Sequence, residues 1–324
     1  MNPELINILN TIVRSATPLI IASLGETITE RAGMINLSLN GSLLLSALAG
    51  YVVAKTTNNI LLGVLAAALV GLLIAAIIGL GAIPLRQDQV ALGFVLTLLA
   101  ENMAKFLGTP YNNKPGLSLG QQPIPILSDI PIIGPILFNQ NLFVYFSFAL
   151  IFVLWWWLFR SRPGLAHRAI GERPEAAFAR GTRVNRLRIV ALLVGGALCG
   201  IAGAAYSLDV KAGWASSPAM NGDGWIALAI VIFGGWHPFR VAFGAYLFAA
   251  LRAAASAIQR SPDLNIPLVL LNAMPWLLMI GTLMLVSTGM LDRLLHVMPL
   301  PVQRRLRQIL RSDPPAALGR PFEG

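Results

Sequence analysis

Long blocks of apolar residues alternate with short clusters of proline, asparagine and charged residues along most of this 324-residue chain. The blocks run for about 20 residues, the length that an α-helix needs to cross the hydrocarbon core of a bilayer. No polar stripe recurs within them at helical spacing, although a soluble helical enzyme of this size would show one. The pattern therefore predicts an all-α polytopic membrane protein with about nine transmembrane segments, including one short or broken helix.

The positions of the polar clusters set the expected segments. These are residues 5–25, 36–54, 60–84, 90–108, 141–159, 189–208, 223–236, 241–258 and 268–290. The weakest region joins the first two segments, where Glu26, Glu30 and Arg31 interrupt the apolar run. The segment 223–236 is short and begins at Asn221-Gly-Asp-Gly224, a polar start that favours a half-helix or a broken helix.

The composition agrees with a bilayer environment. The chain is 56% hydrophobic and 12% charged, with mean hydropathy +0.70, whereas soluble domains carry about 25% charged residues. Eight arginines lie between Arg160 and Arg188 and six more follow Leu291, so two stretches hold 14 of the 24 basic residues. Basic loops of this kind face the cytoplasm, so nine crossings place the N-terminus outside. The single cysteine, Cys199, excludes an internal disulfide.

One membrane domain is expected over residues 1–291, followed by a basic cytoplasmic tail at residues 292–324. An external loop at about residues 108–140 contains six prolines, which restrict its backbone without supplying an apolar core. A cytoplasmic loop is expected at about residues 160–188, where the arginines gather. Because the positive charge is confined to such loops, it does not indicate a nucleic-acid partner.

The cytoplasmic loop contains a short helix signal, Ala169-Ile-Gly-Glu-Arg-Pro-Glu-Ala-Ala-Phe-Ala-Arg-Gly181. Pro174 suits the first helical position, and Glu175 puts negative charge in the first turn. Arg180 puts positive charge in the last turn, and Gly181 can adopt the left-handed conformation that ends a helix. A helix so well defined has no apolar reason to form in this loop. We therefore expect it to dock into a groove of another protein.

Enzyme motifs are missing from the sequence. None of the four lysines follows a glycine in a phosphate-binding loop, and no Gly-x-Ser-x-Gly elbow appears. His167, His237 and His296 lack paired metal-ligand spacing. The chain is therefore expected to be a transport subunit rather than an enzyme, with no cofactor of its own. If the solute moves uphill with ATP, the ATP and Mg²⁺ are bound by a separate ATPase chain, which a docking helix would contact.

Three parts of the chain carry a family resemblance. They are Leu24-Gly-Glu-Thr-Ile-Thr-Glu-Arg-Ala-Gly-Met-Ile-Asn-Leu37, Pro110-Tyr-Asn-Asn-Lys-Pro-Gly116 with Ile130-Pro-Ile-Ile-Gly134, and Glu175-Ala-Ala-x-x-x-Gly181. The first resembles the opening motif, the second the external loop of nucleoside-type members, and the third the coupling-loop pattern of one family. That family is the integral-membrane permease subunits of bacterial ABC importers, in the branch for branched-chain amino acids, ribose and nucleosides.

The resemblance implies a permease of the bacterial cytoplasmic (inner) membrane that moves a nucleoside or nucleoside-like solute by alternating access. Besides the lipid bilayer, it implies an ABC ATPase subunit, a second permease subunit that is generally a different chain, and an extracytoplasmic solute-binding protein. One departure is notable, because nucleoside-type relatives usually carry Glu-Gly where this chain has Asn40-Gly41. Ribose-type sugars, riboflavin and branched-chain amino acids therefore stay open as cargo.

Two groups of candidate site residues follow. The ATPase-coupling candidates are Gly171, Arg173, Pro174, Glu175, Ala176, Ala177 and Gly181. The solute-pathway candidates are Asn36, Asn40, Asn221, Asp223 and Trp225. Asparagine offers donors and acceptors to hydroxyls or base edges, the start of a half-helix offers free N–H groups, and a tryptophan ring can stack on a base or sugar. The alternative is that these residues are helix caps and interfacial anchors.

An ion-coupled secondary transporter is the alternative from another class. It requires ionisable groups within the membrane, and the candidates are Glu101 with Lys105, Asp209 and Arg252. Glu101 and Lys105 stand four residues apart in the favourable order, so they can also neutralise each other on one helix. A non-transporting assembly subunit is a third possibility, but it leaves the docking helix unexplained.

Overall fold

The structure, a computed structural model, describes residues 3–214, 222–260 and 314–322, together with residues 273, 277, 280 and 281. Its long helices are α1 (Pro3–Arg31), α2 (Leu39–Thr57), α3 (Ile60–Ala82), α4 (Gln89–Gly108), α5 (Leu142–Arg160), α8 (Val184–Ala205) and α10 (Pro238–Arg260). The shorter helices are α6 (Arg162–Glu172), α7 (Pro174–Ala179) and α9 (Asp223–Phe233). Three brief turns are the 3₁₀ helix η1 (Thr109–Tyr111) and the π-helices η2 (Gly134–Phe138) and η3 (Tyr206–Val210).

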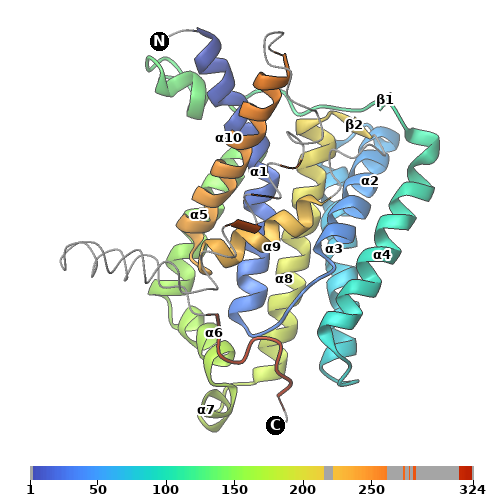
Figure 1. Ribbon diagram of the computed structural model, residues 1–324, viewed down its shortest axis with the longest axis vertical. Coiled ribbons are helices and arrows are strands. Elements are labelled where there is room, and N and C mark those ends of the chain that lie inside the picture. The colour runs from blue at the N-terminus through green and yellow to red at the C-terminus, as the bar shows by residue number, and fades with distance from the viewer. Residues whose placement is uncertain are drawn as a thin grey trace, which may run out of the picture.

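The long helices stand side by side, with α1 and α8 near the centre (Figure 1). Helices α5 and α10 lie on one side of them, and α2, α3 and α4 on the other (Figure 1). At the lower end of Figure 1, α6 and α7 lie near the C-terminus, and the paired strands β1 (Lys114–Pro115) and β2 (Gly213–Trp214) lie near the upper end. Because the arginine-rich loop marks the cytoplasmic end, the strands mark the outer end.

Helices α3 and α8 cross with their backbones in contact. A Cβ atom at Gly200 would collide with the carbonyl oxygen of Ala67, and one at Gly71 would collide with that of Gly196. Only residues without large side chains permit this approach, which is the usual way that helices pack in membranes. The exposed surface of α3 carries six leucines, Leu61, Leu62, Leu65, Leu69, Leu73 and Leu80.

Six helical stretches among the described residues are long and apolar enough to cross a membrane. They are Glu4–Arg31, Ile60–Ala82, Gln89–Tyr111, Leu142–Arg160, Val184–Val210 and Pro238–Ile258. The expected segment 36–54 forms α2, which is not one of the six and carries buried polar residues such as Asn40 and Ser46. Segment 223–236 is the short helix α9, and segment 268–290 lies outside the described residues. The all-α polytopic class is confirmed, whereas the count of about nine segments is not.

The region that looked weakest in the sequence is helical for longer than expected. Helix α1 continues to Arg31, and Glu26 and Glu30 within it are 1% and 4% exposed. Residues 32–38 connect α1 to α2 without regular helix. In this connector, the carbonyl oxygen of Leu37 accepts a hydrogen bond of 2.7 Å from the hydroxyl of Thr97 on α4. Since Thr97 lies eight residues beyond the start of α4, α2 begins about 12 Å along that helix. It therefore begins inside the membrane.

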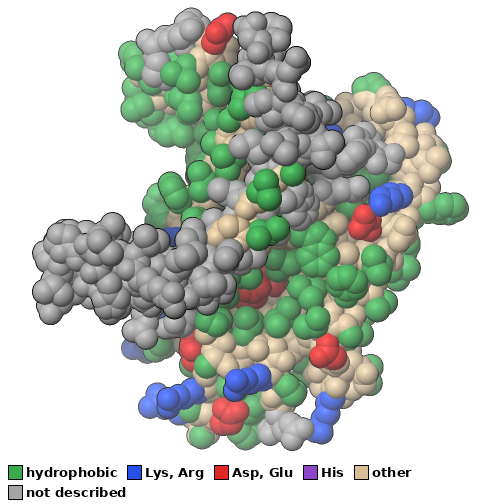
Figure 2. Space-filling model, in the orientation of Figure 1, with side chains coloured by type: hydrophobic (Ala, Val, Ile, Leu, Met, Phe, Trp, Pro, Cys, Tyr) green, Lys and Arg blue, Asp and Glu red, His purple; other side chains and the backbone are tan. Residues whose placement is uncertain are grey.

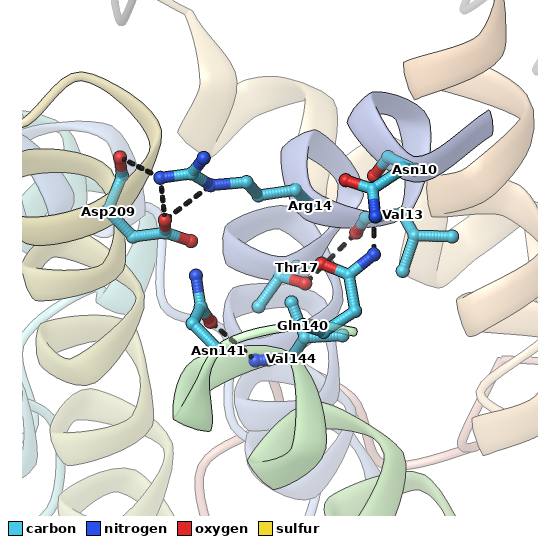
Figure 3. Close-up of polar contacts among 8 residues, drawn as sticks. All are labelled: Asn10, Val13, Arg14, Thr17, Gln140, Asn141, Val144 and Asp209. Atoms are coloured by element: carbon cyan, nitrogen blue, oxygen red, sulfur yellow. Dashed lines mark hydrogen bonds and ion pairs between the residues drawn. The ribbon is translucent and has the colours of Figure 1, made fainter. Parts of the chain in front are cut away.

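Polar side chains join the outer ends of α1, α5 and α8 (Figure 3). Arg14 of α1 reaches across to Asp209 of η3, where it donates to the carboxylate and, at 2.9 Å, to the main-chain oxygen. Gln140 donates to the main-chain oxygen of Asn10 at 3.5 Å, and Asn141 caps the first turn of α5. The π-turn that ends α8 is therefore tied to α1 by an ion pair.

Candidate functional site

The helix expected in the cytoplasmic loop is present. Helix α7 begins at Pro174 and ends at Ala179, and Gly181 follows with φ +83° in the left-handed region, as the sequence predicts. The coupling candidates with exposed backbone or side chains are Arg173, Glu175, Ala176 and Gly181, and the buried ones are Gly171, Pro174 and Ala177. Phe178, an apolar side chain, is 52% exposed. Helix α7 thus packs through one face and leaves the other exposed.

The described C-terminal residues 314–322 support this helix from the side of the bundle. The N–H of Ala317 donates to the carbonyl oxygen of Gly171 at 2.9 Å. The ring centroid of Phe322 lies 5.6 Å from that of Phe178. This end of the tail therefore packs against the candidate coupling helix, although the sequence indicated only a basic extension.

One arginine of the basic loop is an internal structural residue. Arg188 is 1% exposed, and its guanidinium donates to the carbonyl oxygens of Ala32 at 3.2 Å and Arg320 at 2.9 Å. It therefore links α8 to the end of α1 and to the C-terminal segment. Counting arginines along the sequence did not distinguish it from the exposed members of the loop.

Inside the membrane, the start of α2 meets the start of α9. The side-chain oxygen of Asn40 accepts the N–H groups of Gly222 at 3.0 Å and Gly224 at 3.3 Å, so it caps the first turn of α9. Its amide nitrogen donates to the Glu101 carboxylate at 3.3 Å. Glu101 also pairs with Lys105 at 2.7 Å. Two helices that begin within the membrane and face each other are typical of solute sites in transporters.

The next residues of α9 differ in their surroundings. Asp223 is fully buried, and its carboxylate binds the guanidinium of Arg252 from α10, with Nη1 at 3.0 Å, and the hydroxyl of Tyr206. Trp225 is half-buried, and its ring centroid lies 6.0 Å from that of Phe94 on α4, with the planes 46° apart. Asp223 is therefore held by protein partners, whereas Trp225 lies nearer the surface.

Asn36 lies in the connector before α2 and is 1% exposed. Its N–H donates to Glu26 at 3.2 Å, and its side-chain oxygen accepts the N–H of Ser38 at 3.0 Å. Asn221 lies outside the described residues. Of the solute-pathway candidates, the structure brings together Asn40, Asp223 and Trp225.

Sequence reasoning did not assign Phe94 or Tyr206, and it considered Glu101 either as an ion relay or as the partner of Lys105 on one helix. The structure confirms that pair, at 2.7 Å. A signal for α4 was available, since Phe94, Leu98, Glu101 and Lys105 recur at helical spacing and share one face. The partner of Glu101 could not be found in this way, because Asn40 lies 61 residues earlier in the chain.

No group of three or more His, Cys, Asp and Glu side chains able to hold a metal ion occurs among the described residues. His167 of α6 is 4% exposed, and its Nε2 lies 2.8 Å from the carbonyl oxygen of Ile28. Burial lowers the pKa of His167 to about 4, so the neutral ring donates this hydrogen bond. His167 joins α6 to α1.

Six helical stretches among the described residues are long enough to span a membrane, and α2 and α9 begin inside it and face each other. Together with the exposed helix α7, these features are typical of a membrane transport protein. Sequence comparison identifies the family. The chain belongs to the family described as the branched-chain amino acid transport system, permease component, which matches residues 7–288 of this chain. It is a permease subunit of an ABC importer, a multi-pass inner-membrane protein and not an enzyme, and the ATPase is a separate chain.

Three relatives illustrate the similarity. The chain is 37% identical to a putative glucose ABC transporter permease protein of Haloferax volcanii, over 81% of both chains. It is 31% identical to a nucleoside ABC transporter permease protein of Lactococcus lactis, over 87% of this chain and 94% of the relative. It is also 31% identical to a guanosine ABC transporter permease protein of Bacillus subtilis, over 90% of this chain and 95% of the relative. No solved structure matches the chain.

Proposed function

We propose that this permease carries a nucleoside or nucleoside-like solute into the cell. The observation that carries the proposal is the similarity to the two permeases named for nucleoside and guanosine, at 31% identity over 87% and 90% of this chain. The site supports it, because aromatic rings and a carboxylate lie beside the facing helix starts. An aromatic ring suits a base, and a carboxylate suits ribose hydroxyls.

Sugar import is the second candidate, since one relative at 37% identity is named a putative glucose permease. The Asn40-Gly41 departure also favoured a wider range of cargo. However, Glu101 brings a carboxylate within 3.3 Å of the Asn40 amide nitrogen. A carboxylate, paired with Lys105, is therefore present beside position 40 even though the residue there is an amide, which supports the nucleoside proposal.

Helix α7 is the proposed contact with the ATPase. Its exposed side offers Glu175 and Phe178, while Pro174 and Ala177 anchor it to the bundle. Closure of the ATPase subunits would push on this rigid, capped helix. Motion would then pass through α6 and Arg188 to the ends of α1 and α8 and produce alternating access. ATP and Mg²⁺ would stay on the partner, and this chain would bind no cofactor.

The proposed solute path runs beside the start of α9, with Asn40, Asp223 and Trp225 around it. Asn36 and Asn221 complete the candidate group from the connector and from the segment before α9. In the full arrangement, residues 1–291 form a permease domain of about nine segments and residues 292–324 a cytoplasmic tail. A second permease subunit, most simply a different chain, would enclose the other side of the path.

The outer end offers a surface for an extracytoplasmic solute-binding protein. Lys114 of β1 and Lys211 after η3 line the same surface hollow with Trp214. Lys55 lies next to it and donates to the Pro115 carbonyl oxygen at 3.1 Å. These positive groups would suit an acidic surface on the binding protein.

Uptake into proteoliposomes tests the function. The permease, its partner permease, the ATPase and the binding protein would be reconstituted and offered labelled guanosine, glucose, ribose, riboflavin or leucine. We expect ATP-dependent guanosine uptake that other nucleosides compete with and glucose does not. Uptake of glucose alone would replace the nucleoside proposal by sugar import. Ion-driven uptake without the ATPase would overturn the importer itself.

A further inference from the structure

The exposed face of α4 differs from that of α3. On α3 the large exposed side chains are leucines and Ile77, all aliphatic, whereas α4 presents Phe94 and Leu98 and then the ion pair of Glu101 with Lys105. Glu101 lies 12 residues beyond Gln89, which is about 18 Å along the helix and therefore well inside the span. Charged groups at such depth face a water-filled cavity or another protein rather than lipid.

Figure 2 looks onto this side of the molecule. An acidic and a basic side chain adjoin each other over the part occupied by α4, among hydrophobic side chains. Phe94 is 49% exposed and Leu98 is 51% exposed. The surface therefore combines accessible aromatic and aliphatic groups with a fixed carboxylate.

This surface adjoins the facing helix starts. Asn40 holds the Glu101 carboxylate from the start of α2, and Trp225 meets Phe94 from the first turn of α9. Three helices thus supply one patch, made of Phe94, Trp225, Glu101 and Asn40, which we call the aromatic–acid patch. Because α9 is tied to α10 by Asp223 and Arg252, a movement of these helices would change the spacing of the patch.

We propose that the aromatic–acid patch is a binding subsite for nucleosides on the solute path, in which Phe94 and Trp225 contact the base and Glu101 accepts hydrogen bonds from ribose hydroxyls. This inference rests on the proposed function. Aromatic side chains stack on the π-face of a nucleobase, largely independently of which base it is. The carboxylate forms strong charge-assisted hydrogen bonds with hydroxyl donors.

The mixed chemistry selects the class of ligand. A free hexose presents hydroxyls to a carboxylate but no flat aromatic ring. A branched-chain amino acid can present its ammonium group to Glu101, but it has no flat ring for Phe94 and Trp225. A nucleoside satisfies both parts of the patch, because its base is planar and its ribose carries hydroxyls.

Selectivity provides the first test. In proteoliposomes, Phe94→Leu and Trp225→Leu are expected to raise the KM for guanosine about tenfold, since base–aromatic stacking is of that size. The matched control is Phe106→Leu, because Phe106 is also on α4 and is 79% exposed, but it lies outside the patch. Glu101→Gln is expected to reduce the discrimination between guanosine and a dideoxyguanosine that lacks the ribose hydroxyls. Effects no larger than those of Phe106→Leu would overturn the subsite.

Cysteine accessibility separates a failure of this inference from a failure of the proposed function. In a Cys199→Ala background, Phe94→Cys and Glu101→Cys are expected to react with a charged, water-soluble thiol reagent, and guanosine is expected to slow the reaction. Leu69→Cys on the exposed face of α3 is the control and should stay unreactive. If the parent protein imports guanosine but neither position in α4 reacts, the subsite is wrong and the function stands. If the parent protein imports only glucose, the nucleoside function and the nucleoside subsite are both wrong.

Discussion

Two ion pairs within the spans join residues of different helices. Arg14 pairs with Asp209 between α1 and η3, and Asp223 pairs with Arg252 between α9 and α10. Each acid is almost fully buried, and a buried charge is tolerated when it is paired and hydrogen-bonded. Asp209 and Arg252, which were considered as parts of an ion relay, therefore act as ties between helices, in agreement with ATP as the energy source.

At the cytoplasmic end, His167 is an ionisable side chain that is buried in its neutral form. Its ring is buried and donates to the Ile28 carbonyl oxygen, and burial, with the nearby charge of Arg31, lowers its pKa from 6.5 to about 4. The folded protein therefore excludes a proton that the unfolded chain binds below pH 6.5. The resulting stability is complete above pH 6.5 and is lost as the pH falls towards 4.

We expect the free energy of unfolding to decrease by about 3 kcal/mol between pH 6.5 and pH 4 because of His167 alone. The variant His167→Gln keeps a side-chain donor for Ile28 but does not titrate, so its stability should depend less steeply on pH over this range. Thermal unfolding of both proteins in detergent at several pH values measures the difference. Identical pH profiles would contradict the assignment.

At the scale of the element, α7 is short and depends on its supports. Six residues do not form a stable helix alone, so its position depends on Pro174 and Ala177 packing inward and on the C-terminal segment beside it. Gly181, at φ +83°, lets the chain leave the helix sharply towards α8. The helix is therefore well placed to transmit a push without deforming.

Gly181→Pro and Glu175→Arg are expected to separate ATP hydrolysis from transport. Proline cannot adopt a positive φ, and arginine reverses the charge in the first turn. Both variants should reach the membrane at normal levels while solute-stimulated ATP hydrolysis in proteoliposomes falls at least about tenfold relative to the parent, the loss that removing about 1.4 kcal/mol of interaction gives. Gln87→Arg, at an exposed cytoplasmic position outside α7, is the control. Unchanged stimulation in both α7 variants would remove the coupling role.

For the whole molecule, the basic end and the strand end lie on opposite sides. The arginine-rich loop, α7 and the C-terminal residues gather at one end, and β1 and β2 lie near the other (Figure 1). Lys55 and Lys105 lie in the last turns of α2 and α4, and Lys114 and Lys211 lie in the outer connections. The gathering of arginines at one end predicts that this end faces the cytoplasm.

Labelling of single cysteines checks this orientation. In a Cys199→Ala background, Ser118→Cys should react with an impermeant maleimide in intact cells, whereas Arg183→Cys should react only after permeabilisation. Both native residues are exposed, and Cys199 is buried, so the replacements should not disturb packing. The reverse labelling pattern would invert the topology and remove the coupling assignment with it.

Much of this protein could be predicted from local sequence. The apolar blocks gave α3, α4 and α5 to within two residues at either end, because crossing a bilayer requires a fixed length of apolar helix. The cap signals of α7 were equally local, since a proline and a glycine act on the residues beside them. The polar start of α9 marked an interrupted helix for the same reason.

Tertiary structure decided what those elements do together. That Asn40 caps α9, that Glu101 lies against Asn40 and that Phe94 meets Trp225 follow from how α2, α4 and α9 pack. No pattern within one helix contains this information, because each contact joins residues far apart in the chain. The sequence alone therefore determined the class of protein and the short helix α7, and it predicted the orientation. Packing determined which polar residues are structural and which line the proposed path.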